Sequence, residues 1–183
     1  VGGNSQAWTP VMPMLAEQRR VIAWSAPGYG GSTPFAAIEP TVDDYADAAL
    51  RLLDALGLEK ADVLGHSMGG LIGARLASIA PNRVGKLVLA DCSSGHRGYD
   101  QEKRAQILAT RMSQDTSDPE AYARVRAPKL LSANARPEHL AQAIEALSRL
   151  QQPGFGQGAR MVSNSDIFEF AAQVSADTAV LCG

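Results

Sequence analysis

Short apolar, β-branched runs that alternate with helical patterns constrain the fold of this chain more than any other feature. The runs cover residues 20–24, 61–64, 86–90 and 178–182. Their length and unbroken apolar character are typical of buried parallel strands. Helical patterns lie between them, so the sequence predicts an α/β fold with a doubly wound, mostly parallel sheet.

The helix expected from about residue 42 carries its own start and stop signals. Thr41 and Asp44 have the spacing of a capping box, and Gly57 is placed as a C-terminal stop. A second helix is expected after Ser67, ending before Pro81.

The alternation of strands and helices stops between residues 92 and 176. No convincing strand occurs there, and a clear amphipathic helix follows Pro137, which suits a first helical position. We therefore predict a core at residues 1–93, an all-helical cap inserted at residues 94–176, and the start of a returning core strand at residues 177–183.

Composition excludes several classes of partner. The formal net charge is −2, without a basic stripe, so we expect no nucleic-acid partner. The apolar runs are too short to cross a bilayer, so we expect no membrane partner either. Cys92 and Cys182 lie far apart without metal-ligand spacing, so no metal site is predicted. The expected location is the cytoplasm.

Both ends of the chain are abrupt. It opens on Val1 and a glycine-rich turn, with no Met and no signal-peptide pattern, and it ends one loop residue after an apolar run. We expect the chain to be a fragment of a longer protein.

The sequence Gly-His-Ser-Met-Gly at residues 65–69 matches the pattern G-x-S-x-G. A strand is expected before it and a helix after it, which is the context that this pattern needs. The serine would then occupy a strained turn, and Gly65 and Gly69 would let the strand and helix approach closely. The hydroxyl of Ser67 would be exposed beside the N-terminus of the helix. The alternative is an ordinary glycine-rich turn with a solvent-facing serine.

These residues resemble the α/β-hydrolase superfamily, and the likeness covers nearly the whole chain. It is closest to the branch of lactonases, esterases and C–C hydrolases, whose helical cap matches the predicted insertion. The matching segments are the nucleophile elbow at residues 65–70, a loop at 24–32 in which Ser25 replaces the usual Asp, an oxyanion loop at 2–8, and strands at 87–91 and 180–183.

The resemblance implies roles for particular residues. Ser67 would be the catalytic nucleophile that forms an acyl-enzyme. The backbone N–H of Met68 would be the first oxyanion-hole donor, and Val1 would supply the second if His-Gly precedes it. The substrate would be a small-molecule ester, lactone or related acyl compound, and no cofactor is implied. The resemblance leaves the oligomeric state open.

The resemblance also places the catalytic acid and histidine beyond Gly183. Asp91 stands where a minority of the family keeps the acid, although a strand-end turn role is the favoured interpretation. His66, His96 and His139 are expected to be structural or surface residues. We therefore expect the 183-residue chain to be inactive and to fold poorly on its own.

Other functions remain open from the sequence. Within the same class, a C–C bond hydrolase or a cofactor-free haloperoxidase-like enzyme shares the elbow and the cap. From a different class, a non-catalytic hydrolase-like module could bind a small ligand beneath the cap.

Overall fold

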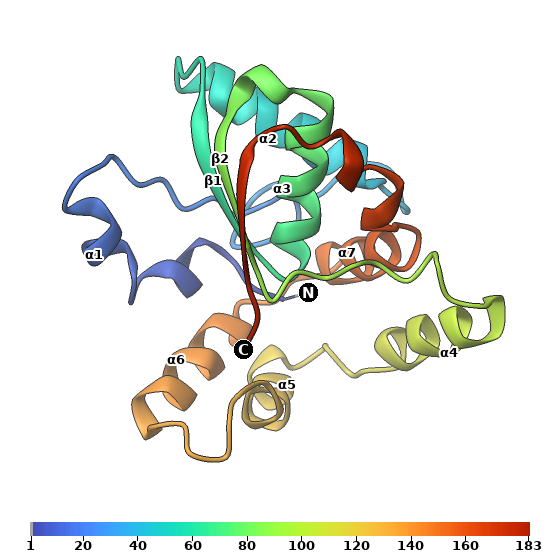
Figure 1. The fold of residues 1–183 in the computed structure, drawn as a ribbon. Helices are drawn as coiled ribbons and strands as arrows, with labels where there is room; N and C mark the ends of the chain where they lie inside the picture. The colour runs from blue at the N-terminus through green and yellow to red at the C-terminus, as the bar shows by residue number, and fades with distance from the viewer. Residues whose placement is uncertain (1) are drawn as a thin grey trace. The chain divides into compact units, whose positions relative to one another are not determined.

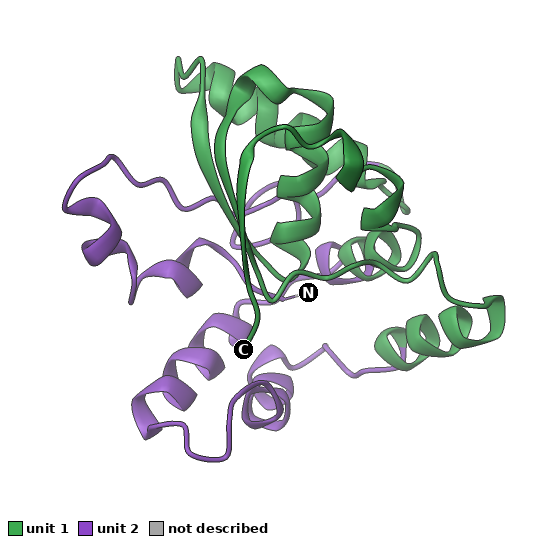
Figure 2. Ribbon diagram, viewed as in Figure 1, with its two compact units in different colours: residues 1, 37–112, 157–183 green, residues 2–36, 113–156 purple. Residues whose placement is uncertain are grey.

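A computed structural model describes residues 2–183 of the chain. Contacts divide these residues into two compact units (Figure 2). The first unit comprises residues 37–112 and 157–183, and the second comprises residues 2–36 and 113–156. The division into a core and a cap at residues 94–176 stays a prediction.

The sheet belongs to the first unit and has three strands in the order β1-β2-β3 (Figure 1). They are β1 (Ala61–His66), β2 (Val84–Ala90) and β3 (Asp177–Leu181). Both pairs are parallel, with Gly65 beside Leu89 and Leu89 beside Val180. The predicted α/β class with a parallel sheet is confirmed.

Two helices of the first unit form where the sequence predicts them. In α2 (Val42–Ala55), Thr41 and Asp44 form both hydrogen bonds of a capping box, and Gly57 follows with a φ of 65°. The helix α3 (Met68–Ile79) packs against β1 and β2, and α2 packs against α3. Leu71 of α3 and Leu87 of β2 are almost completely buried. Burial of these apolar side chains stabilises the unit.

The second unit is helical. Its core is formed by Ala123 and Ala127 together with Leu147, against which Leu140 and Ile144 pack. Its elements are η1 (Ser5–Trp8), α1 (Met12–Ala16), α5 (Pro119–Arg126), η3 (Ala127–Leu130) and α6 (Pro137–Ser148), the helix expected after Pro137.

Among the described residues, the stretch from 94 to 176 contains helices and no strand, as predicted, apart from a single bridge between Gly95 and Asp166. The helices not yet named are α4 (Gln101–Met112), α7 (Gly154–Ser163), η4 (Ile167–Glu169) and η5 (Ala171–Gln173), with η2 (Pro81–Arg83) before β2. No helix among residues 2–183 has the length and apolar character needed to cross a bilayer.

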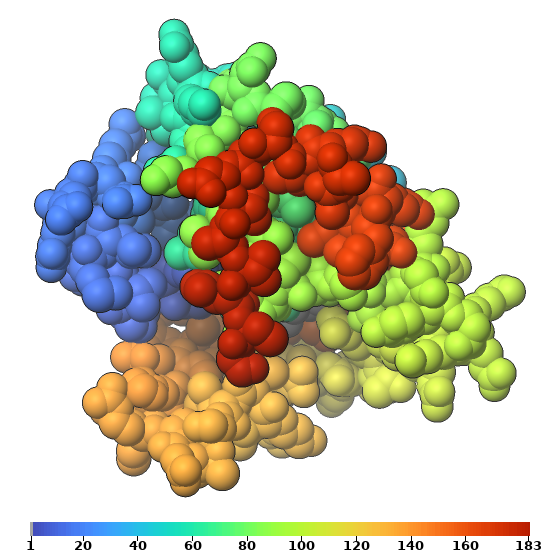
Figure 3. Space-filling model, in the orientation of Figure 1, coloured from blue at the N-terminus to red at the C-terminus, as the bar shows by residue number. Residues whose placement is uncertain are grey.

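Three expectations about strands are wrong. The run at 61–64 forms part of β1, but none of its four residues is fully buried, and Leu64 is exposed. Residues 20–24 form no strand, because an apolar run becomes a strand only when a neighbour completes its hydrogen bonds, and the described sheet contains only β1, β2 and β3. The run at 178–182 forms β3, but all of β3 is exposed rather than buried. Helix α3 packs on β1 and β2, whereas β3 packs mainly against β2, and Figure 3 shows this C-terminal segment, in red, on the surface.

Candidate active site

Ser67 lies in the turn between β1 and α3. Its φ of 53° and ψ of −117° are unusual for a residue with a side chain, and such a conformation costs about 1–3 kcal/mol. Ser67 is the N-cap residue of α3, yet its side chain makes no capping hydrogen bond. Within the first unit, the Ser67 hydroxyl has no hydrogen-bond partner. The turn therefore holds this hydroxyl at the carboxyl edge of the sheet, without a hydrogen bond to any other group of the first unit.

Backbone hydrogen bonds hold the strained turn in place. The Ser67 N–H donates to the Ala90 carbonyl at 3.0 Å, which continues the β1–β2 pairing by one residue. The Ser93 N–H donates to the Ser67 carbonyl at 3.1 Å. The last residue of β2 and the chain just after it therefore fix the peptide groups on both sides of Ser67.

Glycines make the turn possible, although not the pair that the sequence predicts. A Cβ on Gly65 would lie 2.5 Å from the carbonyl carbon of Gly69, so only glycine fits at residue 65. A Cβ on Gly69 would meet nothing within 4 Å, so the expectation is wrong for that residue. Gly70 is the second crowded position, since a Cβ there would lie 2.7 Å from Cys92 Sγ.

The thiol of Cys92 packs against this first turn of α3. The side chain is half-buried, and burial raises its pKa to about 11. Near neutral pH the group is therefore a neutral thiol and a weak nucleophile. These properties indicate a packing role beside the turn.

Met68 is the first residue of α3 and is buried. The N–H groups of a helix's first turn point out of its N-terminal end, where the helix dipole favours negative charge. The position of Met68 suits the role of a backbone donor to an oxyanion. Val1, the other predicted donor, lies outside the described residues.

The histidines of the first unit do not contact the Ser67 hydroxyl. His66 is exposed on β1, and neither it nor His96 forms a hydrogen bond with Ser67. His96 stacks on the Tyr99 ring with a centroid distance of 5.8 Å. Its Nδ1 atom is buried without a hydrogen-bond partner in the described residues. Burial, and secondarily the charge of Arg111, lowers the pKa of His96.

His139 belongs to the second unit. Its Nε2 atom accepts a hydrogen bond of 2.8 Å from Arg136 Nη2, and the two residues lie at the start of α6. This contact suits a structural role on the helix.

Asp91 follows β2 and has a φ of 41°. Its N–H donates to the Leu181 carbonyl at 2.8 Å, and its Oδ1 accepts the Gly183 N–H at 2.8 Å. The carboxylate is exposed and anchors the chain that follows β3. These contacts suit a strand-end turn residue, as favoured from the sequence.

The second unit contains the loop at residues 2–8, which resembles an oxyanion loop, and the loop at residues 24–32. The Ser25 Oγ atom joins them, since it accepts the Ser5 N–H at 3.1 Å and donates to Ser5 Oγ at 2.9 Å. Gly30 packs against Ser25, and a Cβ on Gly30 would lie 2.5 Å from Ser25 Oγ. The sequence pattern around Ser25 does not indicate this link, because it joins residues 20 positions apart.

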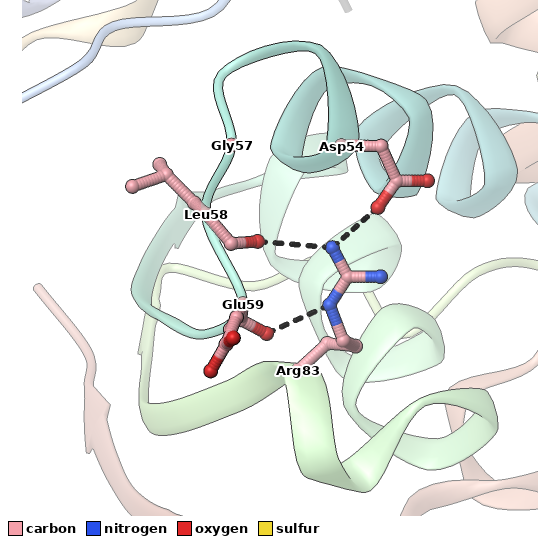
Figure 4. Close-up of a pocket in the computed structure, with 5 residues that line it drawn as sticks. All are labelled: Asp54, Gly57, Leu58, Glu59 and Arg83. Atoms are coloured by element: carbon pink, nitrogen blue, oxygen red, sulfur yellow. Dashed lines mark hydrogen bonds and ion pairs between the residues drawn. The ribbon is translucent and has the colours of Figure 1, made fainter.

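Two pockets, one in each unit, are lined by residues other than Ser67. One, in the second unit, lies among Ser5, Gly30 and the residues around Leu150. The other, in the first unit, is lined by Asp54, Gly57, Leu58, Glu59 and Arg83 (Figure 4). The Arg83 guanidinium donates to Asp54 Oδ1, the Leu58 carbonyl and the Glu59 carbonyl.

The pocket in Figure 4 is a structural feature rather than a candidate active site. Glu59 precedes β1 and Arg83 precedes β2, so the pocket lies at the amino edge of these parallel strands. Ligands of parallel α/β sheets bind at the opposite, carboxyl edge, where Ser67 lies. Within residues 2–183, no group of three or more His, Cys, Asp or Glu side chains could hold a metal ion.

A strand, a serine at positive φ and a helix that begins at the next residue form the turn that carries the nucleophile in α/β hydrolases. The sequence profile described as alpha/beta hydrolase fold matches residues 1–166. The chain belongs to the α/β-hydrolase fold family.

Similar proteins and structures agree with this assignment. The 2-hydroxymuconate semialdehyde hydrolase of Pseudomonas sp. (strain CF600) is 46% identical over 82 residues, which are 45% of this chain and 29% of that protein. A hydrolase structure from Pseudomonas aeruginosa PA01 has a TM-score of 0.82 and 26% identity, covering 100% of this chain and 68% of that one. The enol-lactonase from Burkholderia xenovorans LB400 has a TM-score of 0.81 and 20% identity, covering 98% and 68%.

Proposed function

We propose that the protein containing this chain is a serine hydrolase that transfers an acyl group through Ser67. The observation that carries the proposal is the strained Ser67, whose hydroxyl has no partner within the first unit and stands at the N-terminus of α3. A strained residue persists only where surrounding contacts hold it, and such residues cluster at functional sites. Family membership and a similar hydrolase structure support hydrolysis as the reaction class.

In the proposed reaction, Ser67 Oγ attacks the carbonyl carbon of an ester or lactone and loses its proton to a base. The Met68 N–H stabilises the negative charge that develops on the carbonyl oxygen. The leaving alcohol takes up a proton, and water then releases the acid from the acyl-enzyme. The substrate class is a small ester, lactone or related acyl compound.

We also propose that residues 1–183 alone do not turn over esters. A serine hydroxyl is a weak nucleophile near neutral pH without an adjacent base. No histidine of the first unit hydrogen-bonds to Ser67 Oγ. Loss of a triad member typically lowers the rate by several orders of magnitude, about 10⁴-fold or more.

A fluorophosphonate probe tests the assignment of the nucleophile in the full-length gene product that contains residues 1–183. Mass spectrometry should place the probe on Ser67, and Ser67→Ala should abolish labelling while the protein stays folded. Ser78→Ala is the matched control, since Ser78 lies on α3 and its hydroxyl only donates to the Arg75 carbonyl. Labelling of a different serine would disprove the assignment. Ester turnover by residues 1–183 alone would disprove the need for a further base.

A second candidate substrate comes from the relative that is 46% identical over 82 residues, whose name states that it hydrolyses 2-hydroxymuconate semialdehyde. We propose comparing this compound with p-nitrophenyl acetate in the same full-length protein. A kcat/KM at least tenfold higher for the semialdehyde would favour that substrate over simple esters. A non-catalytic binding module would turn over neither compound and would leave Ser67 unlabelled.

A further inference from the structure

Within the first unit, the chain after β2 pairs with the end of α7 and the chain that follows it. We call the two paired segments, residues 94–97 and 162–167, the clasp. Three backbone hydrogen bonds hold it together: Ile167 N–H to Ser94 O at 2.8 Å, Arg97 N–H to Ser165 O at 3.0 Å, and His96 N–H to Val162 O at 3.0 Å. Gly95 and Asp166 are thereby paired in an antiparallel bridge.

The clasp is tightly packed at Gly95. This residue has a φ of 83°, which favours glycine. A Cβ on Gly95 would lie 2.5 Å from the carbonyl carbon of Ser165. A side chain at residue 95 would therefore clash with the backbone of the second segment, so only glycine fits there.

Ser93 connects this clasp to the candidate nucleophile. Its N–H donates to the Ser67 carbonyl at 3.1 Å. Its hydroxyl oxygen accepts the Gly95 N–H at 3.3 Å. One residue thus contacts both the backbone of Ser67 and the first segment of the clasp.

The Ser67 carbonyl that Ser93 holds belongs to the same peptide group as the Met68 N–H. Because a peptide group is planar, fixing its carbonyl oxygen also fixes the direction of its N–H. The Ser67 carbonyl additionally accepts the Gly70 N–H of the first turn of α3 at 3.0 Å. The peptide plane is therefore held from both the helix and the chain after β2.

We propose that Ser93 is a positioning residue that orients the Ser67–Met68 peptide, and with it the oxyanion donor, through its backbone N–H. This inference rests on the proposed function of Ser67. Ser93 itself does not touch the reacting atoms. The hydroxyl of Ser93 accepts the Gly95 N–H of the clasp, whereas the orienting contact with Ser67 is made by the Ser93 backbone N–H.

Ser93→Pro, which removes the N–H, and Ser93→Ala, which keeps it, form a matched pair for the test. In the full-length gene product, fluorophosphonate labelling of Ser67 should show a kinact that is about tenfold or more lower in Ser93→Pro, with KI little changed. Ser93→Ala should label within about threefold of the wild-type rate, because only the contact with Gly95 is lost. A merely structural defect would instead reduce the fraction of protein that is labelled and lower the urea midpoint, without changing kinact of the folded molecules.

Equal kinact values for folded Ser93→Pro and wild type would overturn the proposal.

Amide hydrogen exchange in the wild-type protein gives a second measurement that needs no variant. The Ser93 amide should exchange as slowly as amides inside β2, and rapid exchange would also overturn the proposal, even if Ser93→Pro failed to fold. If the wild-type protein is labelled at Ser67 but Ser93→Pro and Ser93→Ala have the same kinact, only the proposed role of Ser93 fails. If wild type does not label at all, the proposed function fails, and the role of Ser93 in it fails too.

Discussion

Gly65 faces the backbone of Gly69 so closely that no side chain fits between them. A Cβ on Gly65 would lie 2.5 Å from the Gly69 carbonyl carbon and 2.6 Å from the Gly70 α-carbon. Both neighbours are backbone atoms of α3, which cannot rotate away as a side chain could. The close approach of β1 and α3 at the elbow therefore depends on this one glycine.

Gly65→Ala should consequently displace the start of α3. We expect the free energy of unfolding to fall by about 1–3 kcal/mol, because the added methyl overpacks a rigid site. Gly69→Ala is the matched control, since a Cβ there meets nothing within 4 Å and alanine favours the helix. Urea denaturation followed by circular dichroism measures both changes. Equal stability of the two variants would contradict this account of the turn.

Arg83 should stabilise the connection between α2 and β1. Its guanidinium donates to Glu59 O at 2.8 Å, to Leu58 O at 3.0 Å and to Asp54 Oδ1 at 2.6 Å. Because the ion pair with Asp54 is partly exposed, most of the expected loss in Arg83→Ala comes from the two backbone carbonyls. We expect the free energy of unfolding to fall by about 1–2 kcal/mol.

The control for Arg83 is Arg51→Ala, a change at an exposed arginine on α2. A change at such a site is usually within about 0.5 kcal/mol of wild type. If the urea midpoints of the two variants shift equally, the contacts of Arg83 do not stabilise the fold.

His96 should make stability depend on pH. Its folded-state pKa is lowered from 6.5, first by burial and then by Arg111, so protonation favours the unfolded state. The stabilising contribution of neutral His96 is complete above pH 6.5 and is lost as the pH falls from 6.5 toward the lower folded-state pKa. We therefore expect Tm to fall less steeply in His96→Gln than in wild type as the pH is lowered from 6.5 toward the folded-state pKa of His96.

Gln101→Ala is the control for that measurement, because Gln101 is an exposed, non-ionisable residue at the start of α4. It should keep the wild-type dependence of Tm on pH. An unchanged slope in His96→Gln would show that His96 does not carry the effect.

The two cysteines should differ in reactivity. Burial raises the pKa of the Cys92 thiol to about 11, so only about one molecule in a thousand carries the thiolate at pH 8. Cys182 is exposed. Iodoacetamide followed by peptide mass spectrometry should find Cys182 modified first, and Cys92 modified readily only after addition of urea. Faster alkylation of Cys92 in the native protein would contradict its packing against Gly70.

Features that depend on neighbouring residues could be predicted from the sequence. Thr41 and Asp44 lie within one helical turn, so their capping box needs no distant contact. The positive φ of Gly57 and the turn at Ser67 likewise follow from local patterns. The apolar runs also predicted that β1, β2 and β3 are strands, because their length and apolar composition are typical of parallel strands, but the runs did not predict the exposure of β3.

Features that join distant parts of the chain required the tertiary structure. Residues 20–24 have the composition of a strand but no described strand beside them, and β3 is exposed because α3 packs on β1 and β2 instead. The sequence predicted Gly65 as crowded but placed the second crowded glycine at Gly69 rather than Gly70, since only the packed structure brings Cys92 against α3. The hydrogen bond from Ser93 to Ser67 crosses from one strand end to the next. Local patterns encode the turn itself, whereas the contacts that hold it depend on which residues the folded backbone brings within hydrogen-bonding distance.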